Sequence, residues 1–360
     1  NLEELQEIYK ELTITKSKEF AQEKLEYLNE KQMKYQTDKE FYCWNLLQAR
    51  LNLAMNNLET CVLSLDFLKE EEEHLGDLQR YYFYKLQGIY EYQTYNIDKA
   101  IKSMNLALLS SKDLYIPDWE KADINYMISL CYLADEHLIN CIMYINEALT
   151  YFQAKFKFRR VIECYIVLGV AYMKTYLYDK ANETYLLALK LVEELNISNY
   201  KELLYHNIGA LNALKHSKES IKYFKMSLEN TNDPTKKLES IFCIMKEYSK
   251  YAEWESVEEW AEIGLDIIKD TENKGIQQNY YHHFKIYHSI STLGFIPEEY
   301  GRAAVNYFEE TKEYKYCIRY SNLMGKHFYN QGKYKLAASF YEDANNYILK
   351  EKRLNYWEDL

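Results

Sequence analysis

Residues 165–195 read YIVLGVAYMKTYLYDKANETYLLALKLVEEL, and this stretch decides the fold. Its apolar residues recur every three or four positions, which is typical of amphipathic helices. Gly169 lies in the middle of the first helical segment, and Ala181 and Ala188 lie on one face of the second. Small residues at such places let two helices approach closely, while aromatic residues fill the gaps between them. The stretch therefore predicts a pair of closely packed helices.

The same pattern returns along the chain at a nearly constant spacing. A residue in the middle of each first helix marks the repeat, and the marks are Gly88, Ser129, Gly169, Gly209, Met245, Phe284 and Gly325. They are 41, 40, 40, 36, 39 and 41 residues apart. The best copy matches the tetratricopeptide pattern with Tyr165, Leu168, Gly169, Tyr172, Ala181, Tyr185 and Ala188. Because one hairpin cannot bury its own apolar face, such units stack. We predict an all-α protein, a right-handed superhelical tetratricopeptide-repeat (TPR) solenoid of helical hairpins.

The first part of the chain is also helical in pattern but lacks the small-residue signature. We therefore divide the chain into an N-terminal helical segment over 1–76 and a TPR domain over 77–354. The acidic run KEEEEHLGD (69–77) is expected to be a solvated helix end with Gly76 as its C-cap. The repeats at 239–268 and 278–309 depart most from the pattern and rest on spacing alone.

Composition and charge exclude several classes of protein. Ten glycines and three prolines are too few for a fold of many short strands. The net charge of −11 and the lack of a long basic run argue against nucleic-acid binding by this chain itself. The seven cysteines form no CxxC pair and are expected to be buried thiols in a reducing cytoplasm. No signal peptide or apolar run of membrane-spanning length is visible, so we predict a cytoplasmic protein without a membrane partner.

Motifs of common enzymes are missing from the sequence. GxGxxG, GxxxxGK[ST], GxSxG and HExxH do not occur. His282, His283 and His288 are close in sequence but lack helical ligand spacing, so a surface or groove role is favoured over a metal site. We therefore predict neither a cofactor nor a metal, and a binding solenoid rather than an enzyme with an ordinary cleft.

Polar residues on the first helices are the candidate ligand contacts. In stacked hairpins these helices line the concave face, and residues three, four and seven apart point the same way. The expected peptide-binding side chains are Tyr126, His206, Asn207, Lys246, Lys285, Asn322 and Lys326, with Lys85, Tyr92, Gln93 and Lys174 on the earlier repeats. An asparagine amide can donate to and accept from a peptide backbone at once, and lysine can bind a carboxylate. The alternative is that these polar residues are simply solvated.

Asn207 is the preferred candidate in this row. It lies in the stretch YHNIG (205–209), where Ile208 and Gly209 are the packing pair and His206 and Asn207 are expected to project to the concave side. Asparagine is a mediocre helix former, so its place in the middle of a helix calls for a reason other than stacking.

Together these features resemble one family, the peptide-sensing regulators of Gram-positive bacteria that include the Rap, NprR, PlcR and PrgX proteins. The stretch FYCWNLLQARLNLA (41–54) is similar to the aromatic-LL-x-x-R segment of Rap helical domains. The resemblance implies a quorum-sensing receptor that binds a short reimported signalling peptide in the concave groove. It also implies that Asn207, Asn212 and Asn322 hold the peptide backbone.

The resemblance further implies a switch between inhibition of the sporulation phosphorelay and activation of transcription. DNA would be bound only through a helix-turn-helix domain, which is absent from this sequence. The chain begins with Asn rather than Met, so we expect such a segment to precede it. A homodimer or tetramer is expected.

Two other functions stay open at this point. A Rap-type phosphatase acting on a response regulator would need a glutamine from the N-terminal helices to position water, and Gln36 is the candidate, with Gln32 and Gln48 as alternatives. All three could equally be exposed helix glutamines. The second alternative is a generic scaffold for a protein partner.

Overall fold

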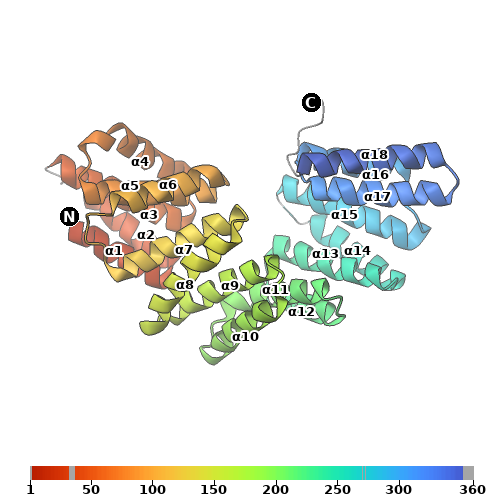
Figure 1. Ribbon diagram of the computed structural model, residues 1–360, viewed down its shortest axis with the longest axis horizontal. Coiled ribbons are helices and arrows are strands. Elements are labelled where there is room, and N and C mark those ends of the chain that lie inside the picture. Colours follow the sequence, from red (N-terminus) through yellow and green to blue (C-terminus); the bar gives the residue numbers. More distant parts are fainter. Residues whose placement is uncertain (1, 32–36, 270, 272, 352–360) are drawn as a thin grey trace. The chain divides into compact units, whose positions relative to one another are not determined.

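The computed structural model describes residues 2–31, 37–269, 271 and 273–351. Within these ranges the chain forms eighteen α-helices and no strand (Figure 1). Contacts divide the chain into two compact units, residues 1–198 (unit 1) and residues 199–360 (unit 2). The predicted all-α fold of helical hairpins is confirmed. None of the described helices combines the length and the apolar character that crossing a membrane requires.

Each unit is a stack of antiparallel helices. Unit 1 contains α1 (Leu2–Thr15), α2 (Lys18–Lys31), α3 (Asp38–Met55), α4 (Leu58–Glu70), α5 (Asp77–Gln93), α6 (Ile97–Ser110), α7 (Asp118–Ala134), α8 (Leu138–Ala154), α9 (Phe158–Lys174) and α10 (Tyr178–Glu194). Unit 2 contains α11 (Lys201–Leu214), α12 (Glu219–Glu229), α13 (Pro234–Lys250), α14 (Trp254–Lys269), α15 (Lys274–Leu293), α16 (Glu298–Glu310), α17 (Tyr314–Asn330) and α18 (Tyr334–Glu351). Short 3₁₀ turns lie at Glu72–His74 and Ser198–Tyr200.

The marked glycines lie where the two helices of a hairpin touch. A Cβ added to Gly169 would lie 2.2 Å from the ring of Tyr185 on α10, and one added to Gly325 would lie 2.8 Å from the ring of Tyr341 on α18. Gly88 meets Met104 on α6 in the same way, at 2.9 Å. Only a hydrogen atom fits between these backbones and side chains, so the glycines set the close approach of the helices.

In the two degenerate repeats the close contact between a glycine and a large side chain joins successive hairpins instead of the two helices of one hairpin. Here the large residue Phe284 occupies the mark on the first helix, and the glycine that it meets is Gly264 on the preceding helix, α14. Gly301 on α16 likewise faces Met324 on α17. The hairpins expected at 239–268 and 278–309 are thus confirmed as α13–α14 and α15–α16. The glycine lies on the second helix of one hairpin and meets the first helix of the next hairpin, which is why the sequence pattern was weak there.

Several helices end in a left-handed residue that is not glycine. After α5, Tyr95 has φ 61° and the N–H of Asn96 donates to the carbonyl of Glu91 at 2.8 Å. Tyr176 after α9 and Ala252 after α13 repeat this arrangement with φ 63° and 54°. Glycine usually takes this position because an L side chain there costs about 1–2 kcal/mol.

The region between α4 and α5 differs from its prediction. Gly76 has φ −66° and is the N-cap of α5, and its N–H donates to Oε1 of Gln79 at 3.0 Å. The expectation that Gly76 caps the end of the preceding helix is therefore wrong, because the acidic run ends in a 3₁₀ turn before it. The predicted domain boundary at 76/77 falls inside unit 1, between these two helices, and stays a prediction.

The cysteines behave as predicted. All seven are free thiols, and six of them are buried. Burial raises the pKa of Cys61 and of Cys141 to about 12. These thiols are therefore inert packing groups at neutral pH.

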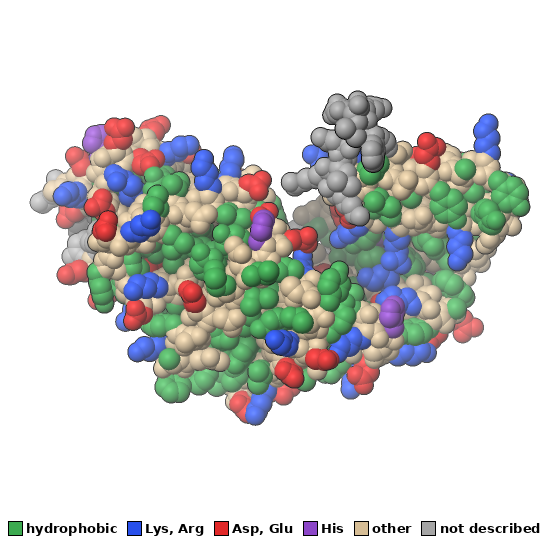
Figure 2. All heavy atoms as spheres, viewed as in Figure 1, with side chains coloured by type: hydrophobic (Ala, Val, Ile, Leu, Met, Phe, Trp, Pro, Cys, Tyr) green, Lys and Arg blue, Asp and Glu red, His purple; other side chains and the backbone are tan. Residues whose placement is uncertain are grey.

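Large hydrophobic side chains are exposed on the helices α8 to α10 of unit 1 (Figure 2). They include Ile139, Met143, Phe156, Leu186 and Leu187. Apolar surface of this kind is typical of protein interaction sites. The homodimer or tetramer expected from the sequence stays a prediction.

Candidate functional site

The first candidate region is a buried ionic network in unit 1. Lys85 on α5 is completely buried and pairs with Glu120 and, at 2.7 Å, with Asp123, both on α7. Arg160 on α9 is completely buried too, and its guanidinium lies 3.0 Å from Asp123 and 2.9 Å from Glu163. The network therefore joins three successive first helices.

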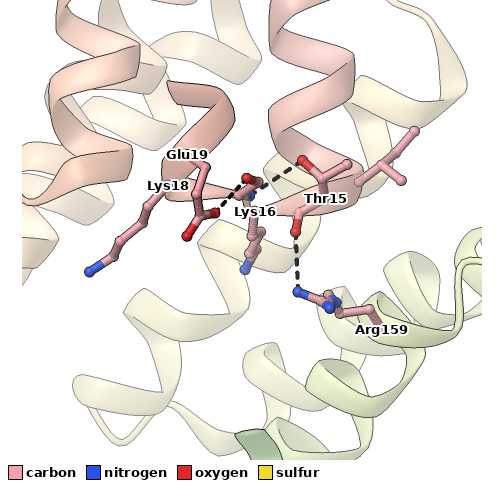
Figure 3. A pocket seen from close by; sticks show the side chains of 7 residues that line it. Thr15, Lys16, Lys18, Glu19 and Arg159 are labelled. Carbon is pink, nitrogen blue, oxygen red and sulfur yellow. Dashed lines mark hydrogen bonds between the residues drawn. The ribbon is translucent and has the colours of Figure 1, made fainter. Parts of the chain in front are cut away.

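Helix α1 closes this network, because it packs against α3, α7 and α9. Lys16, in the left-handed turn after α1 (φ 47°), places its Nζ 2.8 Å from an oxygen of Glu163. Close by, Nη1 of Arg159 donates to the carbonyl of Thr15 at 3.3 Å (Figure 3). The turn between α1 and α2 is thus held on α9 by two cationic side chains.

Burial and charge act in opposite directions on the carboxyl groups of the network. Burial raises the pKa of Glu120, and the neighbouring charge of Lys85 only partly offsets this. Burial acts in the same sense on Asp123, but the charges of Lys85, Arg160 and Arg50 outweigh it and hold the pKa of Asp123 below its usual value. Asp123 is therefore the anionic centre of the network.

A cavity of ≈ 310 Å³ adjoins the network, and we call it the Arg50 pocket. Its lining residues are Leu12, Lys16, Arg50, Leu53, Ala54, Ile89, Tyr92, Gln93, Asp123, Tyr126, Met127, Leu130 and Arg160. The ring of Tyr126 lies 4.7 Å from Nζ of Lys16 and 4.2 Å from Cζ of Arg160. Tyr126, expected as a groove residue, therefore lies in this pocket with cations close to its ring.

The sequence prediction for Lys85 is wrong. Lys85 was expected to line an open groove, but its ammonium group is enclosed by Glu120, Asp123 and the hydroxyl-bearing ring of Tyr9, 5.8 Å away. The sequence did hold a signal for this network: Glu120 and Arg160 both stand nine residues before their repeat marks. Stacked repeats bring equivalent positions near one another, so opposite charges there indicate a charged seam, although Arg160 pairs with Asp123 and Glu163 rather than with Glu120.

The second candidate region is the row of polar residues on the first helices of unit 2. Asn207 on α11 is 8% exposed, and its Nδ2 has no hydrogen-bond partner among the described residues. His206 beside it is partly buried, with Nε2 3.5 Å from Glu239 on α13 and its ring 5.4 Å from that of Phe224. An unpaired buried amide costs about 1–3 kcal/mol, which a ligand acceptor would recover.

The other predicted residues of the row differ in their exposure and in the contacts that their side chains already make. Nζ of Lys246 on α13 lies 5.4 Å from the ring of Phe242, and Nζ of Lys285 on α15 lies 5.2 Å from that of Tyr300. On α17, Lys326 and Asn322 are exposed. The amides of Asn322 and Asn212 each donate to a carbonyl four residues earlier in their own helices, at 2.9 Å. Within the row, the described buried atoms without a hydrogen-bond partner are Nδ2 of Asn207 and Nδ1 of His206.

Of the three clustered histidines, His283 is buried, whereas His282 and His288 are partly exposed. His283 is 1% exposed, stacks on Phe242 at 4.3 Å and on Phe308 at 4.7 Å, and shares a hydrogen bond with Tyr320. Burial, together with nearby positive charges, lowers the pKa of His283 well below its ordinary value. The expectation of a surface or groove role for His283 is wrong, because its ring fills the core between three first helices.

His288 instead approaches two carboxylates that the sequence spacing did not point to. Glu258 and Glu262 on α14 and His288 on α15 place their ligand atoms within 4.8 Å of one another. Carboxylate and imidazole groups can hold a divalent cation. All three side chains are at least partly exposed, and we assign them no metal role.

The glutamines proposed for phosphatase chemistry lie in different settings. Gln36 and Gln32 lie outside the described residues. Gln48 is 5% exposed and donates to Asn29 on α2 at 2.7 Å, so it ties α3 to α2. Gln48 is therefore not an exposed helix glutamine but a buried packing group.

The chain is similar to regulators of known kind, although no family model matches it. The transcriptional activator NprA of Geobacillus stearothermophilus is 26% identical over 311 residues, which cover 84% of this chain and 77% of NprA. Two Bacillus subtilis proteins are also 26% identical: the regulatory protein RapD over 55% of this chain and 58% of its own, and the response regulator aspartate phosphatase I over 44% and 41%.

Solved structures of the same kind share the fold. The apo form of the quorum sensor NprR from B. thuringiensis superposes with a TM-score of 0.81 at 16% identity, covering 96% of this chain and 97% of that chain. NprR in complex with its cognate peptide NprX superposes with a TM-score of 0.69 at 18% identity, covering 96% and 98%. At this level of identity the superpositions establish the fold alone.

Proposed function

We propose that this chain, which is homologous to NprA and the Rap proteins of the Rap/NprR family, is a cytoplasmic receptor for a short signalling peptide. The observation that carries the proposal is the similarity to the transcriptional activator NprA over 84% of the chain. NprR, which has the same fold, is known in complex with its cognate peptide NprX, and this supports a peptide as the ligand.

In this proposal the first helices of unit 2 hold the peptide. Asn207 donates from its unpaired Nδ2 to a peptide carbonyl, and His206 lies beside it. Lys246, Lys285 and Lys326 supply positive charge for acidic groups, with Asn212 and Asn322 as further polar contacts. Peptide binding would switch the protein between inhibition of the sporulation phosphorelay and activation of transcription, with DNA bound through a helix-turn-helix domain outside this sequence.

Calorimetry with the whole chain tests the peptide proposal. The probes are the NprX peptide and a library of short synthetic peptides. We expect one peptide to bind per chain, and a peptide at a hundred times its Kd to stabilise the fold by about 2.7 kcal/mol. Asn207→Ala should weaken binding about tenfold or more, because a buried hydrogen bond is lost.

Asn146→Ala is the matched control for this experiment. Asn146 is an exposed asparagine on α8, the second helix of its hairpin, and its amide donates to its own helix at 2.7 Å. This variant should bind peptide like the wild type. If no short peptide binds and Asn207→Ala changes nothing, the proposal fails. Binding of long helical segments only would support a protein-binding scaffold instead.

A second candidate function is a Rap-type phosphatase acting on a phosphorylated response regulator. It rests on the similarity to the response regulator aspartate phosphatase I over 163 residues. The test is the lifetime of a phosphorylated receiver domain with and without the chain. We expect the chain to shorten that lifetime, Gln36→Ala to abolish the effect, and Gln22→Ala, which changes an exposed glutamine of α2, to retain it. An unchanged lifetime with the wild-type chain would exclude this activity.

A further inference from the structure

The charges around the Arg50 pocket do not balance. Its network contains four cations, Lys16, Arg50, Lys85 and Arg160, and three carboxylates, Glu120, Asp123 and Glu163. One positive charge is therefore left over among the described residues. A buried or half-buried charge without a counterion is costly, so an anion brought to this place is strongly favoured.

Arg50 on α3 is the cation of the network that makes no direct ion pair, and its charge acts on Asp123 only at longer range. Lys16, Lys85 and Arg160 each lie within 3.0 Å of a carboxylate oxygen, whereas no described carboxylate forms an ion pair with Arg50. Its Nε is buried and has no hydrogen-bond partner, and its guanidinium carbon lies 5.4 Å from the ring of Tyr9. Arginine presents its donors as a planar fork that matches a carboxylate. An anion in the pocket would find these donors unused.

A free acceptor lies in the same pocket. Gln93 on α5 donates from Nε2 to the carbonyl of Leu53 at 3.4 Å, and this contact holds the amide in place. Its Oε1 is buried and has no partner among the described residues. A ligand that satisfies both groups carries an anionic group such as a carboxylate for Arg50 and a donor such as an N–H for Gln93.

Beside the charged side chains of the network and the rings of Tyr92 and Tyr126, the pocket has an aliphatic wall. It is formed by Leu12, Leu53, Ala54, Ile89, Met127 and Leu130. The volume of ≈ 310 Å³ corresponds to about ten water molecules at ~30 Å³ each, and it lies at the lower end of small-molecule pockets. An apolar side chain of one or two residues fits these dimensions.

We propose that the Arg50 pocket binds an apolar amino-acid residue that has a free α-carboxylate and an acylated nitrogen. The carboxylate pairs with the guanidinium of Arg50, the N–H donates to Oε1 of Gln93, and the side chain packs on the aliphatic wall. Such a group is the C-terminal residue of a peptide or a free N-acyl amino acid. The pocket lies wholly within unit 1, so this proposal does not depend on peptide binding by the row in unit 2.

Calorimetry with the whole chain tests the proposal. The probes are N-acetyl-leucine and a pentapeptide that ends in leucine, each compared with its C-terminal amide. We expect both acids to bind and both amides to bind at least about tenfold more weakly, because only the acids carry the charge that Arg50 recognises. Equal affinity of the pentapeptide acid and N-acetyl-leucine identifies an N-acyl amino acid as a sufficient ligand, and tighter binding of the pentapeptide identifies a peptide C-terminus.

Two variants and two controls locate the binding. Arg50→Met should weaken the acids about tenfold or more. Ala54→Trp fills the pocket without removing a charge and should abolish binding even if Arg50→Met fails to fold. Arg302→Met, which removes an exposed arginine of α16, and Asn146→Ala, which changes an exposed asparagine of α8, should bind both acids like the wild type. Equal binding of acid and amide, or no binding of either acid, overturns the proposal.

Discussion

Replacing Gly169 by alanine tests whether close packing within the hairpin α9–α10 maintains the repeat. A Cβ at this position would lie 2.2 Å from Cε1 and 2.7 Å from Cζ of Tyr185. Carbon atoms in contact are normally about 3.5–4.0 Å apart, so the ring would have to move by more than about 1 Å. Tyr185 has no exposed surface, so its ring has no free space to enter.

Two opposing effects set the magnitude. Alanine is favoured over glycine inside a helix by about 1 kcal/mol. Overpacking a buried site costs about 1–3 kcal/mol and occasionally more, and a contact as short as 2.2 Å belongs at the upper end. We therefore expect Gly169→Ala to lower the free energy of unfolding by about 2 kcal/mol, which corresponds to a Tm lower by about 4–8 °C.

Thermal and urea unfolding followed by circular dichroism measure this change. Tyr185→Leu supplies the control, because it removes the ring atoms that meet the new Cβ. In that background Gly169→Ala should be neutral or should stabilise the fold, and the cycle should yield a coupling energy of about 2–3 kcal/mol. A Gly169→Ala protein that unfolds at or above the wild-type temperature would refute the close-packing argument.

Three further predictions concern charge, protonation and backbone strain. Arg160→Met removes one cationic partner from each of the buried carboxylates Asp123 and Glu163, which keep only Lys85 and Lys16, and should lower the free energy of unfolding by about 3 kcal/mol in urea titration, whereas the exposed Arg302→Met should change it by less than about 1 kcal/mol. His283 stays neutral in the fold because burial, with Arg319, Lys246, His282 and Lys315 nearby, lowers its pKa, while the unfolded chain takes up a proton near pH 6.5. The contribution of His283 to stability is therefore present above pH 6.5 and lost as the pH falls. Between pH 7.5 and pH 5.5 the free energy of unfolding of the wild type should fall by about 1.4 kcal/mol more than that of His283→Phe. Equal losses in the two proteins would contradict this. Ala252→Gly relieves the left-handed strain at φ 54° and should raise the free energy of unfolding by about 0.5–1 kcal/mol, as measured by thermal unfolding; a drop would show that the strain is not there.

The positions of the helices could be predicted from the sequence, whereas the surroundings of the polar residues could not. The best-patterned hairpin, around Gly169, lies where its sequence placed it, because apolar periodicity and small residues act over a few neighbouring positions. At the degenerate repeats the spacing alone was enough, although the glycine lies on the second helix of a hairpin and contacts the next hairpin, as Gly264 shows. Gly76 was misplaced because a glycine at a helix boundary can end one helix or begin the next, and only the local backbone decides.

The candidate site was harder to predict. Of the row in unit 2, Asn207 was singled out from its sequence setting, and the structure adds that its amide nitrogen is buried and unpaired. Arg50 entered the prediction only as part of the segment 41–54 that resembles Rap proteins. Nothing in its own helix reveals that its guanidinium makes no ion pair. Lys85 and His283 were taken for solvated groups because a polar residue on a first helix looks the same in sequence whether or not another helix covers it.

The sequence by itself determined that this protein is a stack of helical hairpins with a period of about 40 residues, because helix formation and hairpin packing depend on residues close together in the chain. Only the tertiary structure decided which polar groups are solvated and which are enclosed. Helix α1 packs on α7 and α9, far from it in sequence, and thereby buries Arg160 and Asp123 and shapes the Arg50 pocket. Charge balance is a property of all the helices that meet at one place, and no spacing within a single helix encodes it.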